Sequence, residues 1–275
     1  MQDDAAEPIG TAPAPYRLRP SPIFIGLLAV TLVSGIALYA GVGASRVGAP
    51  GAGASGVGAL GVIAFVFVAA AWVVSLCLHE FGHALVAYRY GDQSVLYRGY
   101  LTLDPLRYTH VVFSLVLPLV FVLLGGIGLP GGAVFIDRRA LRSRFAHSAV
   151  SAAGPLANIA FVILLSLILN LRDGHLAFWA ALAFLLFLQV TAVVLNILPV
   201  PGLDGFGIIE PYLPQRWLAR AARIAPYAIL ILFGLLWIPP VNRVFFSVIL
   251  AIVGLLGAPT ELVGQGYGLF RFWTG

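Results

Sequence analysis

Long apolar segments separated by short polar loops make up most of this 275-residue chain. An α-helix needs about 20 mainly apolar residues to cross the hydrocarbon core of a bilayer. Four runs approach or exceed this length, and two shorter runs near the C-terminus can form a further helix pair. The runs cover residues 23–41, 61–88, 147–171 and 177–198, followed by 226–238 and 244–257. The pattern therefore predicts an all-α polytopic membrane protein with about six transmembrane helices.

Two segments between residues 94 and 134 depart from this pattern. Residues 94–110 (SVLYRGYLTLDPLRYTH) are rich in β-branched and aromatic residues and carry two arginines and a proline. They cannot form a lipid-facing helix, and they predict a small β element at the membrane edge. Residues 111–134 are apolar for about one span, but Pro118 and the GGIGLPGG run would interrupt a helix. This segment either spans the membrane or is re-entrant.

The positions of the arginines help to distinguish these alternatives, because short cytoplasmic loops carry an excess of positive charge. With Arg17 and Arg19 inside, the cluster DRRALRSR at 137–144 also lies inside only if residues 111–134 do not cross. A re-entrant segment therefore fits better than a full span. The same count places both termini in the cytoplasm.

Composition agrees with a membrane protein and excludes other classes. Hydrophobic residues make up 60% of the chain and charged residues 10%, whereas a soluble domain carries roughly 25% charged residues. The net charge is +5, but the basic residues lie in short loops without interleaved aromatics, so no nucleic-acid partner is expected. Every basic residue is Arg, and Ala and Gly are abundant, which favours a bacterial or archaeal cytoplasmic membrane.

The motif HEFGH interrupts the second apolar run. His79 and His83 are four residues apart, so on a helix both imidazoles can face one cation, and Glu80 can reach a water molecule on it. The alternative is a histidine pair satisfied by other groups within a helix bundle. The motif lies about 15 Å of helix before Arg89, below the membrane interface, where three polar groups need a compensating partner. This depth favours a metal ion.

A catalytic zinc site usually has three protein ligands and one position for water. The best candidate for the third ligand is Asp204, in the sequence NILPVPGLDG at 196–205. Pro199 and Pro201 end an apolar helix there, and the topology places Asp204 at the same cytoplasmic depth as HEFGH. On spacing alone, Asp204 could instead be a turn residue that ends the helix.

Three motifs in this order, HEFGH, AGPLAN at 153–158 and NILPVPGLDG, resemble the site-2 protease family of intramembrane zinc metalloproteases. YLTLDPL at 100–106 resembles the short form without PDZ or CBS domains. The resemblance implies that His79, His83 and Asp204 bind one zinc ion and that Glu80 is the general base. It also implies that Asn158 contacts the substrate or the oxyanion. The stretches YTHVVF and GGAVFID depart from the family pattern, which affects substrate contacts more than the metal site.

The function expected from these residues is hydrolysis of peptide bonds in or near transmembrane segments of membrane-protein substrates. A helical substrate must be unwound locally, and the strand expected at 94–104 could pair with it. Two other functions remain open: a metal-ion transporter, and an inactive homologue that binds membrane clients. The sequence does not indicate an oligomeric state.

Four regions summarise this organisation. Residues 1–22, acidic and then rich in proline and alanine, are predicted to be a disordered cytoplasmic tail. Residues 23–60 contain the first transmembrane helix and a Gly/Ala-rich linker. Residues 61–215 form the catalytic membrane core, and residues 216–275 form a C-terminal helix pair and an interfacial tail.

Overall fold

A computed structural model describes residues 19–41, 53–108 and 134–274, with side chains described from residue 58 onwards in the second range. Within these ranges the chain is helical, and five helices are long and apolar enough to cross a membrane. The segment 111–134, expected to be re-entrant, lies outside the described residues except for Val134. The all-α polytopic class is therefore confirmed for the described part of the chain.

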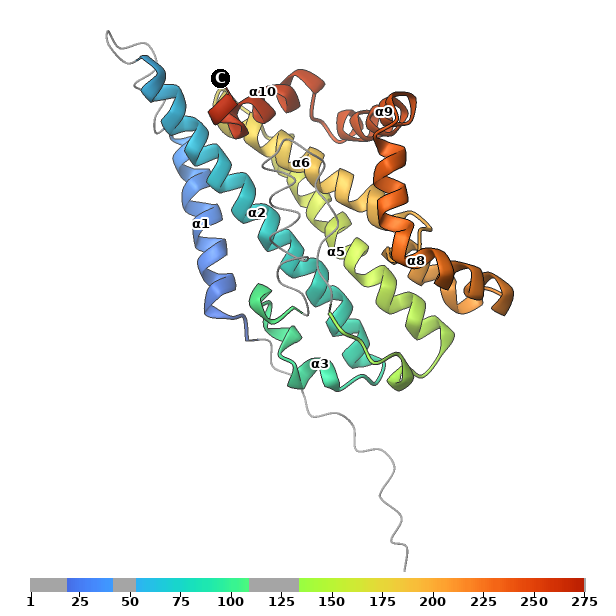
Figure 1. The fold of residues 1–275 in the computed structure, drawn as a ribbon. Helices are drawn as coiled ribbons and strands as arrows, with labels where there is room; N and C mark the ends of the chain where they lie inside the picture. The colour runs from blue at the N-terminus through green and yellow to red at the C-terminus, as the bar shows by residue number, and fades with distance from the viewer. Residues whose placement is uncertain (1–18, 42–52, 109–133, 275) are drawn as a thin grey trace, which may run out of the picture.

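The five candidate spans follow the apolar runs of the sequence (Figure 1). They are α1 (Pro22–Tyr39), α2 (Gly53–Arg89), α5 (Arg144–Leu169), α6 (Leu176–Ile197) and α8 (Gln215–Leu236). The helices α9 (Pro239–Leu255) and α10 (Thr260–Phe270) follow, with a bend of 107° between them. Counting this bent pair as one span gives up to six.

The C-terminal region differs in detail from the expected helix pair. The run 226–238 belongs mainly to α8, which begins at Gln215 and includes the arginines before it. This helix has polar and apolar faces, and its apolar window is only 11% buried in the bundle. The apolar run is thus one half of a longer amphipathic helix, because the helical period continues through the arginine-rich sequence.

The β element expected in residues 94–110 is wrong for the described part, 94–108. These residues form three short helical turns, α3 (Ser94–Tyr97), η2 (Tyr100–Thr102) and η3 (Pro105–Arg107). Gly99 and Leu103 have φ angles of +74° and +58°, which interrupt an extended backbone. Asp104 accepts a hydrogen bond from the Leu106 amide and starts η3. Turn-forming residues therefore override the β-branched composition.

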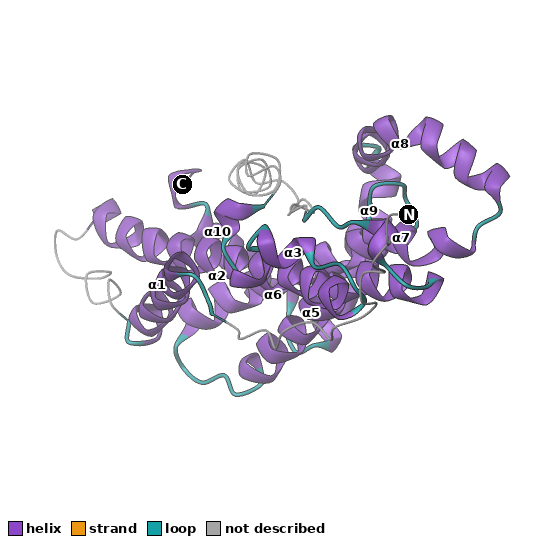
Figure 2. Ribbon diagram, turned by 90° about the horizontal axis from the view of Figure 1, so that it is seen from below, coloured by secondary structure: helices purple, strands orange, loops and turns teal. Residues whose placement is uncertain are grey.

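The central helices are α2 and α6; α1, α5 and α10 pack against them, whereas α8 lies at the side of the bundle next to α9 (Figure 2). Close approach is possible where glycines face a neighbour: a Cβ on Gly266 of α10 would lie 2.0 Å from the Ala180 carbonyl oxygen of α6. Phe270 is fully buried in this packing. The helix α10 is therefore part of the bundle core.

The helix ends are divided between the two ends of the bundle (Figure 1). At one end α1 begins beside η2, where the Ser21 amide donates to the Thr102 carbonyl oxygen at 2.7 Å, and α2 ends at Arg89. At the other end Phe272, after α10, packs on Gly61 near the start of α2. The beginning of α1 and the end of α10 thus lie at opposite ends of the bundle.

A polar cluster attaches the second end of α1 to the loop between α5 and α6. The Tyr39 hydroxyl donates to Asp173 Oδ2 at 2.5 Å, and Trp179 Nε1 donates to Asp173 Oδ1 at 2.9 Å. These hydrogen bonds, above all the one from Tyr39, lower the pKa of the Asp173 carboxyl. The cluster holds α1 beside the start of α6.

Candidate metal centre

The two histidines of HEFGH meet on one face of α2, as the helical period requires. His79 and His83 are buried, and their Nε2 atoms lie 3.1 Å apart. His83 Nδ1 lies 2.7 Å from the Val150 carbonyl oxygen of α5. Because a carbonyl can only accept, Nδ1 carries the proton and Nε2 keeps its lone pair. His83 is therefore held in the tautomer that a metal ion needs.

The turn between α6 and α7 brings Asp204 to these histidines. Gly202 has a φ of +97°, and a Cβ on Gly205 would lie 2.0 Å from the Ile197 carbonyl oxygen. Only glycine permits this tight return, which makes Asp204 the first residue of α7 (Asp204–Ile209). The two carboxylate oxygens each lie 3.3 Å from one histidine Nε2. The structure thus brings Asp204 to His79 and His83, although it follows them by more than 120 positions in the sequence.

The spacing of these atoms fits a zinc ion. Zn–N and Zn–O bonds of about 2.0–2.2 Å in a tetrahedral site place neighbouring ligand atoms roughly 3.3–3.5 Å apart. The facing atoms are separated by 3.1 and 3.3 Å, and one ligand atom from each residue lies within 4.8 Å of the others. Two imidazoles and a carboxylate form a donor set that zinc accepts, with a fourth position left for water.

Gly154 of α5 forms the wall opposite the histidines, and the sequence analysis did not single it out. A Cβ at this position would lie 2.2 Å from His83 Nε2 and 2.7 Å from His79 Nε2. Its neighbour Ala153 approaches Gly82 of α2, where a Cβ would lie 2.8 Å from the Ala153 carbonyl oxygen. A glycine before Pro155 within an apolar helix was the available signal. Its absent side chain leaves room for the ion.

Glu80 lies beside the histidines without joining them. Its Oε1 is 4.0 Å from His79 Nε2, and its Oε2 accepts a hydrogen bond from the Val134 amide at 3.1 Å. The side chain is almost fully buried. The Val134 amide therefore holds one carboxylate oxygen and leaves the other on the side of the metal centre.

The segment that supplies this amide is fixed to the end of α2 by a second carboxylate. Asp92 is buried, and it accepts hydrogen bonds from the amides of Ser94 at 2.9 Å and Asp137 at 2.8 Å. Residues 134–137 have no helical turn and lie between Glu80 and Asp92. Sequence periodicity offers no signal for these contacts, because the donors are backbone amides.

Asn158 lies one helical turn beyond Gly154 on α5 and is buried. Its Oδ1 lies 3.3 Å from the Ser75 hydroxyl, which also lies 2.6 Å from Gln189 Oε1. A hydroxyl has one proton, and the shorter distance assigns it to Gln189. Ser75 precedes His79 by one turn of α2, so this polar cluster joins α2, α5 and α6 directly beyond the metal centre.

A cavity of about 320 Å³ lies against Asp204. Its walls come from α7, α8 and the loop before α7, and Ser151 of α5 contributes from the other side. Arg138 and Glu210, which also line it, form an ion pair across its partly exposed edge. The cavity provides space for water next to Asp204.

A bundle of membrane helices with a buried His-His-Asp group beside a glutamate is the arrangement of an intramembrane metalloprotease. The chain is 44% identical over 264 residues to Rip2 of Mycolicibacterium smegmatis, covering 95% of this chain and 97% of the relative. It is 45% identical over 263 residues to Rip2 of Mycobacterium tuberculosis, covering 94% and 95%. Both relatives are classed by name as zinc metalloproteases.

YwhC of Bacillus subtilis, named in the same way, is 31% identical over 180 residues, covering 62% of this chain and 79% of that protein. No family model and no solved structure matches the chain. The chain belongs to the site-2 protease family of the Rip2 metalloproteases. In its described residues the helices form the membrane bundle itself, without a PDZ or CBS domain.

Proposed function

We propose that this protein is a zinc-dependent endopeptidase that cleaves peptide bonds in or near transmembrane segments of membrane-protein substrates. The observation that carries the proposal is the group of His79, His83 and Asp204 with Glu80 buried beside it. The relatives named as zinc metalloproteases support the same activity over nearly the whole chain.

The chain's own residues divide the chemistry between them. His79, His83 and Asp204 would hold one zinc ion, which in such a site acidifies a water molecule and polarises a peptide carbonyl. Glu80 accepts the proton from the attacking water at Oε1 and passes it to the departing amine. Asn158, one turn further along α5, would donate its amide to the substrate or the developing oxyanion.

The proposed orientation places the Arg89 end of the bundle in the cytoplasm, because arginine-rich loops favour that side. The cavity beside Asp204 then receives cytoplasmic water. Since the end of α10 lies at the opposite end of the bundle, we assign it to the other side. This assignment revises the expectation that both termini are cytoplasmic.

Two alternative functions have less support. A metal-ion transporter needs a file of polar groups through the membrane. Among the described spans, the buried His, Asp, Glu and Arg side chains are His79, Glu80 and His83, which all belong to one cluster. An inactive homologue that only holds clients has no need for Glu80, which is retained at the centre.

Residues 94–104 cannot pair with an extended substrate as a strand, because this segment forms helical turns. The non-helical residues 134–137 lie closer to the chemistry, with Val134 bonded to Glu80. We assign to this segment the positioning of the general base.

Val134→Pro removes the amide N–H that donates a hydrogen bond to Glu80, and we expect it to lower kcat for cleavage by roughly 10- to 100-fold. A hydrogen bond to a charged group is worth about 1.5–3 kcal/mol, and without it the carboxylate is free to turn away. Val134→Ala retains the amide and is the matched control. Steady-state kinetics with zinc content measured for both variants tests the idea. An equal loss in Val134→Ala would show that packing, not the amide, matters.

Metal removal tests the proposed function as a whole. The purified full-length protein, treated with a zinc chelator, should lose cleavage of a single-span reporter in vesicles and regain it with stoichiometric zinc. Magnesium should not restore it, because two imidazoles and one carboxylate suit zinc better than a hard oxygen-seeking cation. Full cleavage by the metal-free protein would refute the proposal.

A further inference from the structure

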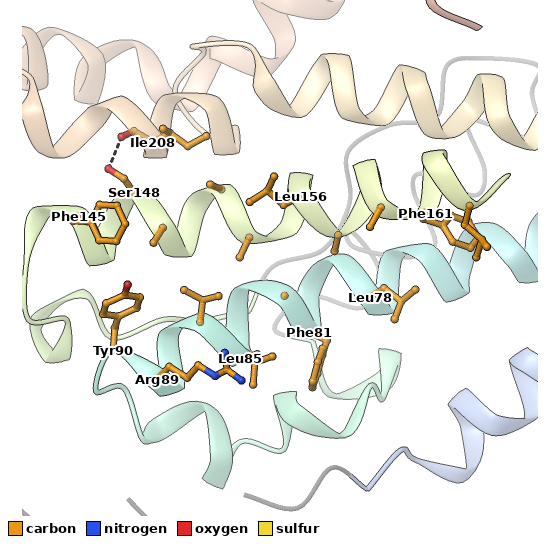
Figure 3. Close-up of a pocket in the computed structure, with 18 residues that line it drawn as sticks. Leu78, Phe81, Leu85, Arg89, Tyr90, Phe145, Ser148, Leu156, Phe161 and Ile208 are labelled. Carbon is orange, nitrogen blue, oxygen red and sulfur yellow. Dashed lines mark hydrogen bonds between the residues drawn. The ribbon is translucent and has the colours of Figure 1, made fainter. Parts of the chain in front are cut away.

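A large groove runs along the outer surface between α2 and α5 (Figure 3). Its volume is about 1120 Å³. Half of the residues on the α5 wall are alanines, and the α2 wall consists mostly of larger apolar residues. The lining of the groove includes Phe81, Leu85, Arg89, Ala149, Leu156 and Ala160. Leu156 is 60% exposed. Sites for apolar ligands are concave and lined mainly by apolar side chains, and this groove has both features.

The groove ends in polar and aromatic groups. Arg89 is exposed at the end of α2, and Tyr90 and Phe145 meet edge to face across the groove with ring centroids 6.2 Å apart. Arg142 lies against Gly91, and Arg144 precedes Phe145 at the start of α5. Aromatic rings and arginines are typical of the membrane interface. This end therefore lies at headgroup level, and the apolar part extends into the bilayer.

The length of the groove limits its occupant. The α2 side lines it over residues 78–90, about 18 Å at 1.5 Å per residue, whereas α5 lines it over residues 145–164, about 28 Å. The groove therefore has two walls over only about 18 Å. This length is roughly half of the ~30 Å hydrocarbon core. One acyl chain of the cytoplasmic leaflet fits such a slot, whereas a transmembrane helix would extend well beyond it.

Charge also favours a lipid over a transmembrane helix as the occupant of the groove. Transmembrane segments carry Lys and Arg on their cytoplasmic flanks, and these would be repelled by the arginines at the end of the groove. An anionic phospholipid carries the opposite charge and is attracted to juxtamembrane arginines. Arg89 forms no ion pair among the described residues, so its guanidinium is available to a headgroup.

We propose that this groove binds an anionic phospholipid of the cytoplasmic leaflet, with its headgroup at Arg89 and an acyl chain between α2 and α5. The base of the groove includes Gly82 and Ala153, whose close approach also sets the position of Gly154. Gly154 forms the opposite wall of the metal centre. A lipid held in the groove therefore supports the helix contact on which the centre is built.

Binding can be measured without cleavage, by native mass spectrometry of the full-length protein with added phosphatidylglycerol or phosphatidylcholine of equal chain length. The wild type should retain one phosphatidylglycerol and prefer it over phosphatidylcholine by about fivefold. This is the preference expected from the attraction of one arginine to an anionic headgroup. Arg89→Gln should lose the preference, and Ala149→Leu, which fills the groove, should lose retention. The controls are Arg216→Gln, an exposed arginine of α8 outside the groove lining, and Ala251→Leu, on an exposed face of α9.

Each outcome decides the proposal. Selective retention that both groove variants lose and both controls keep supports it. Equal retention of the two lipids, or an equal loss in Arg216→Gln, means diffuse attraction to the membrane and overturns it. Dimers in place of lipid adducts would assign the groove to a second copy of the chain. In vesicles, the cleavage rate of the wild type should rise with the phosphatidylglycerol content, and that of Arg89→Gln should not. Lipid binding is measured without cleavage, so a failure of the proposed protease activity would not change the result for lipid binding.

Discussion

Glu80→Gln should reduce cleavage of a single-span reporter by about 10²- to 10⁴-fold, the range that a general acid–base contributes, while zinc content stays unchanged. Glutamine has nearly the same shape, and its carbonyl oxygen can still accept the hydrogen bond from the Val134 amide. It cannot accept a proton from water. Glu80 is also not among the ligand atoms, since its nearest oxygen lies 4.0 Å from His79 Nε2.

The measurement compares initial cleavage rates and zinc per chain for the wild type and the variant in the same vesicles. Glu261→Gln is the matched control, because it makes the same chemical change at an exposed residue of α10. Retained cleavage in Glu80→Gln would remove Glu80 from the mechanism. Loss of zinc would instead show that Glu80 supports the metal site structurally.

The helix that carries the histidines could be predicted because two simple rules act together. An apolar run of this length forms a membrane helix, and a four-residue spacing places His79 and His83 on one face. The depth of Asp204 followed from the proline-broken end of the next span and the count of arginines. These features depend on local sequence and on membrane thickness, so they required no knowledge of tertiary packing.

Other features depend on tertiary contacts and left weak signals in the sequence. Residues 94–107 have the composition of a strand, but the left-handed Gly99 and Leu103 turn the chain so that Val95 and Tyr100 bury against the core. The contact between Glu80 and Val134 uses a backbone amide, which any residue except proline could supply. Composition and periodicity report side chains and cannot reveal such a bond.

The arrangement around the metal centre also explains why small residues gather in AGPLAN. The α5 helix must approach α2 at Gly82 closely enough for the Val150 carbonyl oxygen to accept a hydrogen bond from His83 Nδ1. Pro155 removes one helical amide at the next residue. Asn158 then follows one turn later, on the same helix as the wall formed by Gly154. One short motif thus sets the helix contact, the metal space and the proposed substrate donor.

Gly154→Ala should lower zinc affinity by roughly 10- to 100-fold and cleavage with it, because overpacking costs about 1–3 kcal/mol. The added methyl group would lie 2.2 Å from His83 Nε2 and 2.7 Å from His79 Nε2, so either α5 or the imidazoles must shift. Alanine itself favours the helix by about 1 kcal/mol over glycine. The thermal midpoint of unfolding should therefore change little, whereas the affinity for zinc should fall clearly.

Zinc titration of the metal-free protein, with thermal unfolding measured in parallel, tests this expectation. Gly254→Ala is the matched control, since a Cβ on that α9 glycine meets no atom within 4 Å. If Gly154→Ala binds zinc as tightly as the wild type, the wall does not limit the space for the ion. If both variants lose zinc equally, the effect belongs to helical glycines in general. A selective loss in Gly154→Ala would place α5 among the elements that form the metal centre, although it supplies none of the three ligands.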